Sequence, residues 1–171
     1  INQSENGTVF VAVDFVDVSD KTNINAYLAR LEDEGLVKRV MRGVYYKPQF
    51  SEFLNEETAP SVDKVAHAVA RNFGWTIVPS GDAALNYLGL STQVPATYVY
   101  VSDGAYKEYS YGNTTIQFKK TTNKEVSKLS YKTALVVQAL KSLQYAKILD
   151  SNWMKIKKWF LHCSISILHM I

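Results

Sequence analysis

The hydrophobic positions in the first sixty residues follow a helical period and then a strand period. Ile24, Leu28 and Leu31 recur at helical spacing, which places them on one stripe and predicts an amphipathic helix over residues 22–34. Residues 36–47 are rich in β-branched and aromatic side chains on both sides of a short turn that contains a glycine. This second pattern predicts a β-hairpin directly after the helix.

Local signals mark where this helix begins and ends. Thr22 or Asn23 can cap its first turn, and Gly35 can adopt the left-handed conformation that ends a helix. Residues 13–18 predict a shorter helix just before it. Two helices joined by a tight turn and followed by a basic hairpin are typical of a winged helix. We therefore expect residues 1–58 to form a winged-helix DNA-binding domain, with one further helix before the start of the sequence.

The exposed side of the helix and the hairpin carry residue types that contact duplex DNA. In the major groove Asn can read adenine and Arg can read guanine, while a small Ala permits close approach to base edges. Lys and Arg on a hairpin would neutralise phosphates and add affinity without sequence information. The predicted DNA-binding residues are Thr22, Asn23, Asn25, Ala26 and Arg30 on the helix, and Lys38, Arg39, Arg42 and Lys47 on the hairpin.

The charge distribution leaves a second interpretation open. Residues 1–58 hold six basic and ten acidic side chains, a net charge of −4, whereas residues 59–171 carry a net charge of +7. A negative net charge disfavours binding to DNA, although the segment from Lys38 to Lys47 is locally +4. Winged helices also serve as protein–protein modules. A protein–protein interaction module without DNA binding is therefore the alternative function.

The second part of the chain, residues 59–150, predicts a small α/β domain. One helix is expected between a Ser61 cap and Gly74, and another over residues 131–143. Three β-rich runs lie between them, and the Gly and Asn turn residues that separate these runs predict an antiparallel meander. The runs are 97–101, 106–111 and 115–118. The expected fold class is α+β: an N-terminal winged helix, then an antiparallel sheet with a C-terminal helix.

Several motifs resemble those of the AbiEi-like antitoxin family. They are Gly7-Thr8-Val9-Phe10, Leu28-Ala29-Arg30-Leu31, Gly35-Leu36-Val37-Lys38-Arg39, Arg42-Gly43-Val44-Tyr45-Tyr46-Lys47-Pro48, Val78-Pro79-Ser80-Gly81-Asp82-Ala83-Ala84-Leu85-Asn86 and Gly89-Leu90-Ser91-Thr92-Gln93-Val94-Pro95. The resemblance implies an antitoxin of a type IV toxin–antitoxin, or abortive-infection, operon that acts in phage defence. Its winged helix would bind the double-stranded DNA of the operon promoter, as a monomer or a homodimer. Its second domain would counteract a nucleotidyltransferase-like toxin, directly or indirectly.

A basic run follows the tyrosine-rich strands of the second domain. Rings beside cationic side chains can bind single-stranded nucleic acid, although alternation along a strand more simply places the rings on one sheet face. The resemblance implies that this domain is the antitoxic one. Lys119, Lys120 and Lys124 are therefore the candidate contacts with the toxin or with its nucleic-acid substrate.

Composition narrows the compartment and the chemistry. A single cysteine, Cys163, cannot form an internal disulfide, so a reducing, cytoplasmic setting is expected. The apolar tail, residues 151–171, has an uncharged stretch too short to span a membrane. Its helical spacing favours packing against the core or a partner, and a basic helix on a membrane surface is the alternative. With three histidines, one cysteine and no nucleophile motif, we expect a non-enzyme without a cofactor or a metal.

Overall fold

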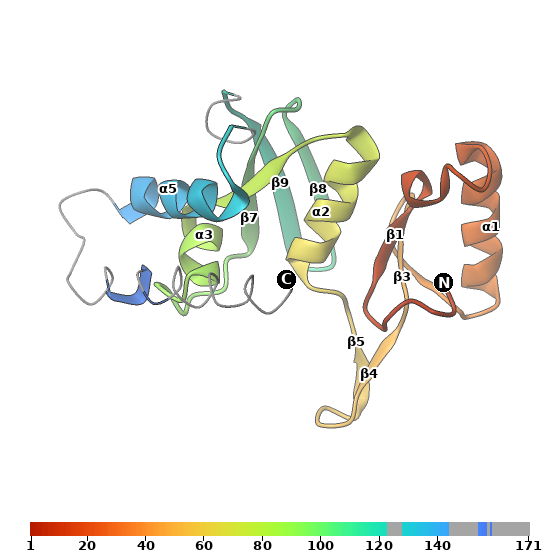
Figure 1. The fold of residues 1–171 in the computed structure, drawn as a ribbon. Coiled ribbons are helices and arrows are strands. Elements are labelled where there is room, and N and C mark those ends of the chain that lie inside the picture. Colours follow the sequence, from red (N-terminus) through yellow and green to blue (C-terminus); the bar gives the residue numbers. More distant parts are fainter. Residues whose placement is uncertain (123–127, 144–153, 157, 159–171) are drawn as a thin grey trace, which may run out of the picture. The chain divides into compact units, whose positions relative to one another are not determined.

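The computed structural model describes residues 1–122, 128–143, 154–156 and 158 (Figure 1). The chain divides into two compact units, Ile1–Trp75 and Thr76–Ile171. Each unit contains both helices and strands, so the mixed α+β class predicted from the sequence is confirmed. None of the described helices combines the length and the apolar character that crossing a bilayer requires.

The first unit is built around a small antiparallel sheet. Its elements are β1 (Val9–Val11), the 3-10 helix η1 (Ala12–Phe15), α1 (Lys21–Asp33), β2 (Lys38–Met41) and β3 (Val44–Tyr46). The strand order is β1-β3-β2, and both pairings are antiparallel. The predicted amphipathic helix and the predicted hairpin are therefore confirmed, and the predicted short upstream helix is a 3-10 turn.

Burial on one side explains why α1 forms at this place. Ile24 and Leu28 are almost fully buried and belong to the core of the unit. The helix is capped by Asp20 rather than by Thr22 or Asn23, because the Asp20 Oδ1 accepts hydrogen bonds from the backbone N–H groups of both residues, at 2.9 and 3.0 Å. Gly35 follows in the left-handed conformation, with φ of 75°, as predicted.

Two further elements complete the first unit. A two-stranded ribbon, β4 (Gln49–Ser51) and β5 (Glu56–Thr58), was not predicted from the sequence, and it extends away from the three-stranded sheet (Figure 1). It is followed by α2 (Val62–Phe73), which begins at the predicted Ser61 cap and ends at Gly74, where φ is 68°. The ribbon and α2 follow β3 in the chain without leaving this unit.

The boundary between the units lies after Trp75, not after residue 58 as the sequence suggested. The reason is that α2 packs on β1 and is tied to the N-terminal segment by long-range bonds. Arg71 of α2 donates to both carboxylate oxygens of Asp14 and to the carbonyl of Val9. Lys64 donates to the carbonyl of Gly7 at 3.4 Å. The helical period identified α2 correctly, but it carried no information about the unit on which α2 packs.

The second unit contains a four-stranded sheet and two helices. Its elements are β6 (Ile77–Ser80), α3 (Gly81–Tyr87), β7 (Thr97–Ser102), β8 (Lys107–Tyr111), β9 (Thr114–Lys120) and α5 (Tyr131–Leu143). The helices pack on one another and on β6. Their shared core includes Val78, Leu88, Leu135 and Ala139. The predicted helix over residues 131–143 is confirmed.

The expected antiparallel meander is wrong. The strand order is β6-β7-β9-β8, and β7 pairs with β9 in parallel, so the sheet is mixed. The physical reason is burial: Tyr100, Ile116 and Phe118 are completely buried, and the β7–β9 pairing sets Tyr100 opposite Phe118 in the middle of the sheet. The more polar β8 is left at the edge, where water can solvate its side chains.

Only part of the apolar tail predicted over residues 151–171 is described. Ile156 is buried in the core that contains α3 and α5, and Lys155 Nζ donates to the carbonyl of Gly89 at 3.3 Å. The remaining tail predictions lie outside the described residues, as does Lys124.

Candidate nucleic-acid interface

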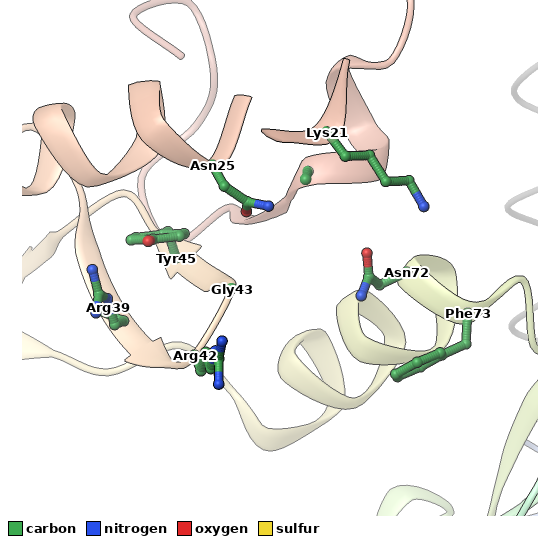
Figure 2. A pocket seen from close by; sticks show the side chains of 9 residues that line it. Lys21, Asn25, Arg39, Arg42, Gly43, Tyr45, Asn72 and Phe73 are labelled. Carbon is green, nitrogen blue, oxygen red and sulfur yellow. The ribbon is translucent and has the colours of Figure 1, made fainter. Parts of the chain in front are cut away.

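The first unit has a basic groove of about 750 Å³ (Figure 2). Its lining comes from η1, the first turns of α1, the β2–β3 hairpin and the last turn of α2. The lining residues, here called the basic groove, are Ala12, Lys21, Asn25, Arg39, Arg42, Gly43, Tyr45, Asn72 and Phe73. Three of them are cationic and none is acidic, so the groove is suited to an anion.

Helix α1 contributes one cation and one amide to the basic groove. Lys21 and Asn25 are one helical turn apart, so they project from the same side of α1. Both are exposed, whereas Ile24 and Leu28 attach the helix to the core. Figure 2 shows the two side chains extending into the same space as Asn72. Asn25 was predicted as a DNA contact, and Lys21 was not.

The hairpin contributes two arginines, of which one is ion-paired and the other has no ion pair with a described residue. Arg42 and Gly43 form the turn between β2 and β3, where Gly43 has a φ of 76° that most L side chains avoid. The guanidinium of Arg39 lies 5.2 Å from the centre of the Tyr45 ring and is ion-paired with Glu32. Arg39 is therefore held in place, whereas no described residue forms an ion pair with Arg42.

The third wall comes from α2 and was missed by sequence reasoning. Asn72 and Phe73 lie in the last turn of α2, and the Phe73 ring stacks on Trp75 with 4.7 Å between centroids. The helical pattern had already identified this helix. The sequence places this helix in the second domain, so the pattern gives no sign of its position at the groove.

A second, smaller hollow lies on the exposed side of α1. It has a volume of about 100 Å³ and is lined by Asn23, Ala26, Tyr27 and Arg30. Arg30 lies over the Tyr27 ring at 5.6 Å, and the Asn23 amide donates to Asp20 at 2.7 Å. The structure thus brings three predicted base-reading residues together here, apart from Asn25. Thr22 is exposed in the first turn of the same helix.

Two predicted phosphate contacts do not line the basic groove. Lys38 is ion-paired with Glu57 of β5, and this hydrogen bond raises the pKa of Lys38 above its usual value. Lys47 Nζ donates to the carbonyls of Asn2 and Ser4, at 3.1 and 2.8 Å, so it fastens the N-terminal segment.

The structure describes two of the three candidate lysines of the second unit. Lys119 and Lys120 are exposed at the end of β9. The nearby Tyr100 is completely buried and packs against Phe118 with 6.0 Å between ring centroids. This tyrosine therefore cannot stack with a nucleic-acid base. Within the described ranges, no three His, Cys, Asp or Glu side chains converge as a metal ion would require.

Comparison with known protein families identifies the family of this chain. It matches a family of unknown function, DUF6088, over residues 1–166. The chain belongs to this family. None of the curated proteins matches it. The match extends over both units, so the basic groove and the four-stranded sheet both lie within the region that defines the family.

Proposed function

We propose that this DUF6088 protein is an antitoxin-like transcriptional regulator whose first unit binds duplex DNA at its operon promoter. The observation that carries the proposal is the basic groove, in which Lys21 and Arg42 converge with Asn25 and with Arg39, whose guanidinium is also paired with Glu32. Cations clustered in a groove create a positive potential that attracts the phosphate backbone, and they supply affinity that does not depend on sequence.

Sequence preference would come from the exposed side of α1. In the proposed winged helix α1 is the recognition helix and the β2–β3 hairpin is the wing. Asn23, Ala26 and Arg30 occupy one hollow on α1, and Asn25 lies nearer the hairpin. This division matches the two tasks of a DNA-binding surface, because base edges are read by Asn and Arg whereas hairpin cations hold phosphates.

The promoter experiment uses the full chain and fluorescence anisotropy on a labelled fragment of its own promoter, over a salt series. Arg42→Ala is expected to weaken binding equally for every sequence. It should also reduce the slope of log K against log salt concentration by about one unit, because one phosphate contact is lost. Lys128→Ala removes the same charge from an exposed position in the second unit and serves as the matched control. Absence of binding at low salt would overturn the proposed DNA-binding function.

The antitoxic part of the proposal rests on the motifs that resemble AbiEi-like antitoxins. The second unit would counteract a nucleotidyltransferase-like toxin in the cytoplasm, without catalysis or a cofactor of its own. In cells whose growth is arrested by a nucleotidyltransferase-like toxin from an adjacent reading frame, co-expression of this protein is expected to restore growth. A Lys119→Ala/Lys120→Ala variant is expected to restore it less well. Full rescue by this variant would remove the two lysines from the proposal. No rescue by the wild type would overturn the antitoxin assignment.

A protein–protein interaction module is the second candidate, and one observation favours it. The β4–β5 ribbon exposes large apolar side chains in and beside its turn: Phe53 is 95% exposed, and Phe50 of β4 and Leu54 are more than half exposed. Apolar groups gathered at an exposed turn are typical of protein-binding surfaces. This module would leave promoter DNA unbound at low salt and would retain its function after loss of the hairpin charges.

A further inference from the structure

Two cations of the β2–β3 hairpin are already neutralised by carboxylates of the same chain. Lys38 is paired with Glu57, which lies on the neighbouring β4–β5 ribbon. Arg39 is paired with Glu32, which lies near the end of α1. The side chains of both pairs remain partly open to solvent. A phosphate approaching the hairpin therefore meets occupied cations, although it can reach them.

The β4–β5 ribbon determines which glutamate covers the hairpin. In the strand register of the ribbon, Glu57 lies opposite Phe50 and Glu56 lies opposite Ser51. Because successive side chains of a strand point to opposite faces, Glu56 points away from the face that carries Glu57. No described residue forms an ion pair with Glu56. The two neighbours are both exposed and carry the same charge but face opposite sides of the strand, which makes them a matched pair.

We propose that Glu57 and Glu32 act as internal competitors for phosphate, which lower the affinity of the hairpin for any nucleic-acid backbone. This inference rests on the proposed function and deepens it, because it names how that site is regulated. Phosphate contacts at Lys38 and Arg39 compete with the carboxylates already paired there. One anion then replaces another, so the net gain from these contacts is small. Arg42 and Lys21 face no such competitor among the described residues and supply the unopposed contacts.

The competition has a measurable size. Exposed ion pairs are weak, so removal of one carboxylate is expected to tighten DNA binding by between about two- and fivefold. Lys38 would then contribute a full phosphate contact, and the salt slope would become steeper by up to about one unit. Loss of one negative charge would by itself also tighten binding. That effect should be the same for any exposed glutamate near the hairpin, whether or not it is paired with a cation.

The experiment therefore compares glutamates in matched pairs in the full chain. Glu57→Gln is compared with Glu56→Gln, and Glu32→Gln with Glu34→Gln, with a 30-base-pair duplex of arbitrary sequence as the probe. Glu57→Gln and Glu32→Gln are expected to tighten binding and steepen the salt slope. The control variants Glu56→Gln and Glu34→Gln should change binding less than twofold. Thermal unfolding of the four variants checks that each one folds.

The possible outcomes separate this inference from the proposed function. If the wild type binds the duplex and Glu57→Gln behaves like Glu56→Gln, the inference is overturned and DNA binding stands. If no protein binds, the DNA-binding proposal fails as well. Competitive acetylation of Lys38 provides a readout that needs no DNA: removal of Glu57 lowers the pKa of Lys38 and should make its amine more reactive. Unchanged reactivity of Lys38 in Glu57→Gln would equally overturn the inference.

Discussion

Arg71 and Asp14 are joined by two hydrogen bonds, from Nε to Oδ1 at 2.9 Å and from Nη2 to Oδ2 at 3.0 Å. The same guanidinium donates to the carbonyl of Val9 at 3.2 Å. One arginine of α2 thus fastens both the start of β1 and η1, although the residues are far apart in the sequence. This bidentate contact explains why α2 belongs to the first unit.

Replacement of this arginine should weaken the first unit. We expect Arg71→Ala to lower the free energy of unfolding by about 1 kcal/mol, because a charge-assisted bidentate pair is lost at a site that remains partly exposed to solvent. Arg71→Lys should recover only part of this loss, since an ammonium cannot form the fork. A double-mutant cycle with Asp14→Asn, followed by urea unfolding, measures the coupling. Additive effects of the two changes would contradict the pairing.

The position of α2 also predicts which fragment folds. A fragment of residues 1–75 retains α2 and the Arg71 contacts, and we expect it to unfold cooperatively on heating. A fragment of residues 1–58 lacks α2 and leaves the β1 face that it covers exposed to water. We expect this shorter fragment to show no cooperative transition by circular dichroism. Equal melting curves for the two fragments would show that α2 is dispensable.

The two exposed sides of α1 predict different effects on DNA binding. Asn25→Ala and Arg30→Ala should each relax discrimination at one or two base pairs, at a cost of about 1–3 kcal/mol for the preferred sequence. Binding to an arbitrary duplex should change much less, since phosphate contacts remain. Selection from a randomised library, followed by affinity measurements, checks this. If both variants lose affinity uniformly, α1 contacts only the backbone.

Tyr111 in β8 predicts a pH dependence of stability. Its hydroxyl is buried without a hydrogen-bond partner among the described residues, and burial raises the pKa of Tyr111 to about 12. The unfolded tyrosine titrates near pH 10, so between about pH 10 and 12 the unfolded state loses its proton first and the folded state loses stability as the pH rises. At lower pH this group contributes no slope.

Tyr111→Phe should remove this alkaline loss. Near neutral pH the substitution should be neutral or stabilise the protein by up to about 1 kcal/mol, because the phenylalanine has no hydroxyl to leave unpaired. Urea unfolding at several pH values measures both effects. Tyr27→Phe, at an exposed position of the first unit, serves as the control. A clear loss of stability at neutral pH would indicate that the Tyr111 hydroxyl has a partner.

The candidate interface could be predicted in part. Asn25, Arg39 and Arg42 followed from the residue types on the predicted helix and hairpin, and they do line one groove. Lys38 and Lys47 have the same charge and lie in the same segment, but they are engaged by Glu57 and by backbone carbonyls. Sequence pattern indicates where charge is present. It does not indicate which charges are already paired, because the pairing partners come from distant elements.

The sequence by itself determined the local elements: α1 from the stripe of Ile24 and Leu28, and the hairpin from its strands and turn. Tertiary structure decided the rest, namely the assignment of α2 to the first unit, the parallel pairing of β7 with β9, and the convergence of Lys21 with Asn72. The physical reason is one of range. Periodicity, caps and turns depend on neighbours within a few residues, whereas packing partners are selected by burial of apolar surface and by ion pairs between segments distant in the chain.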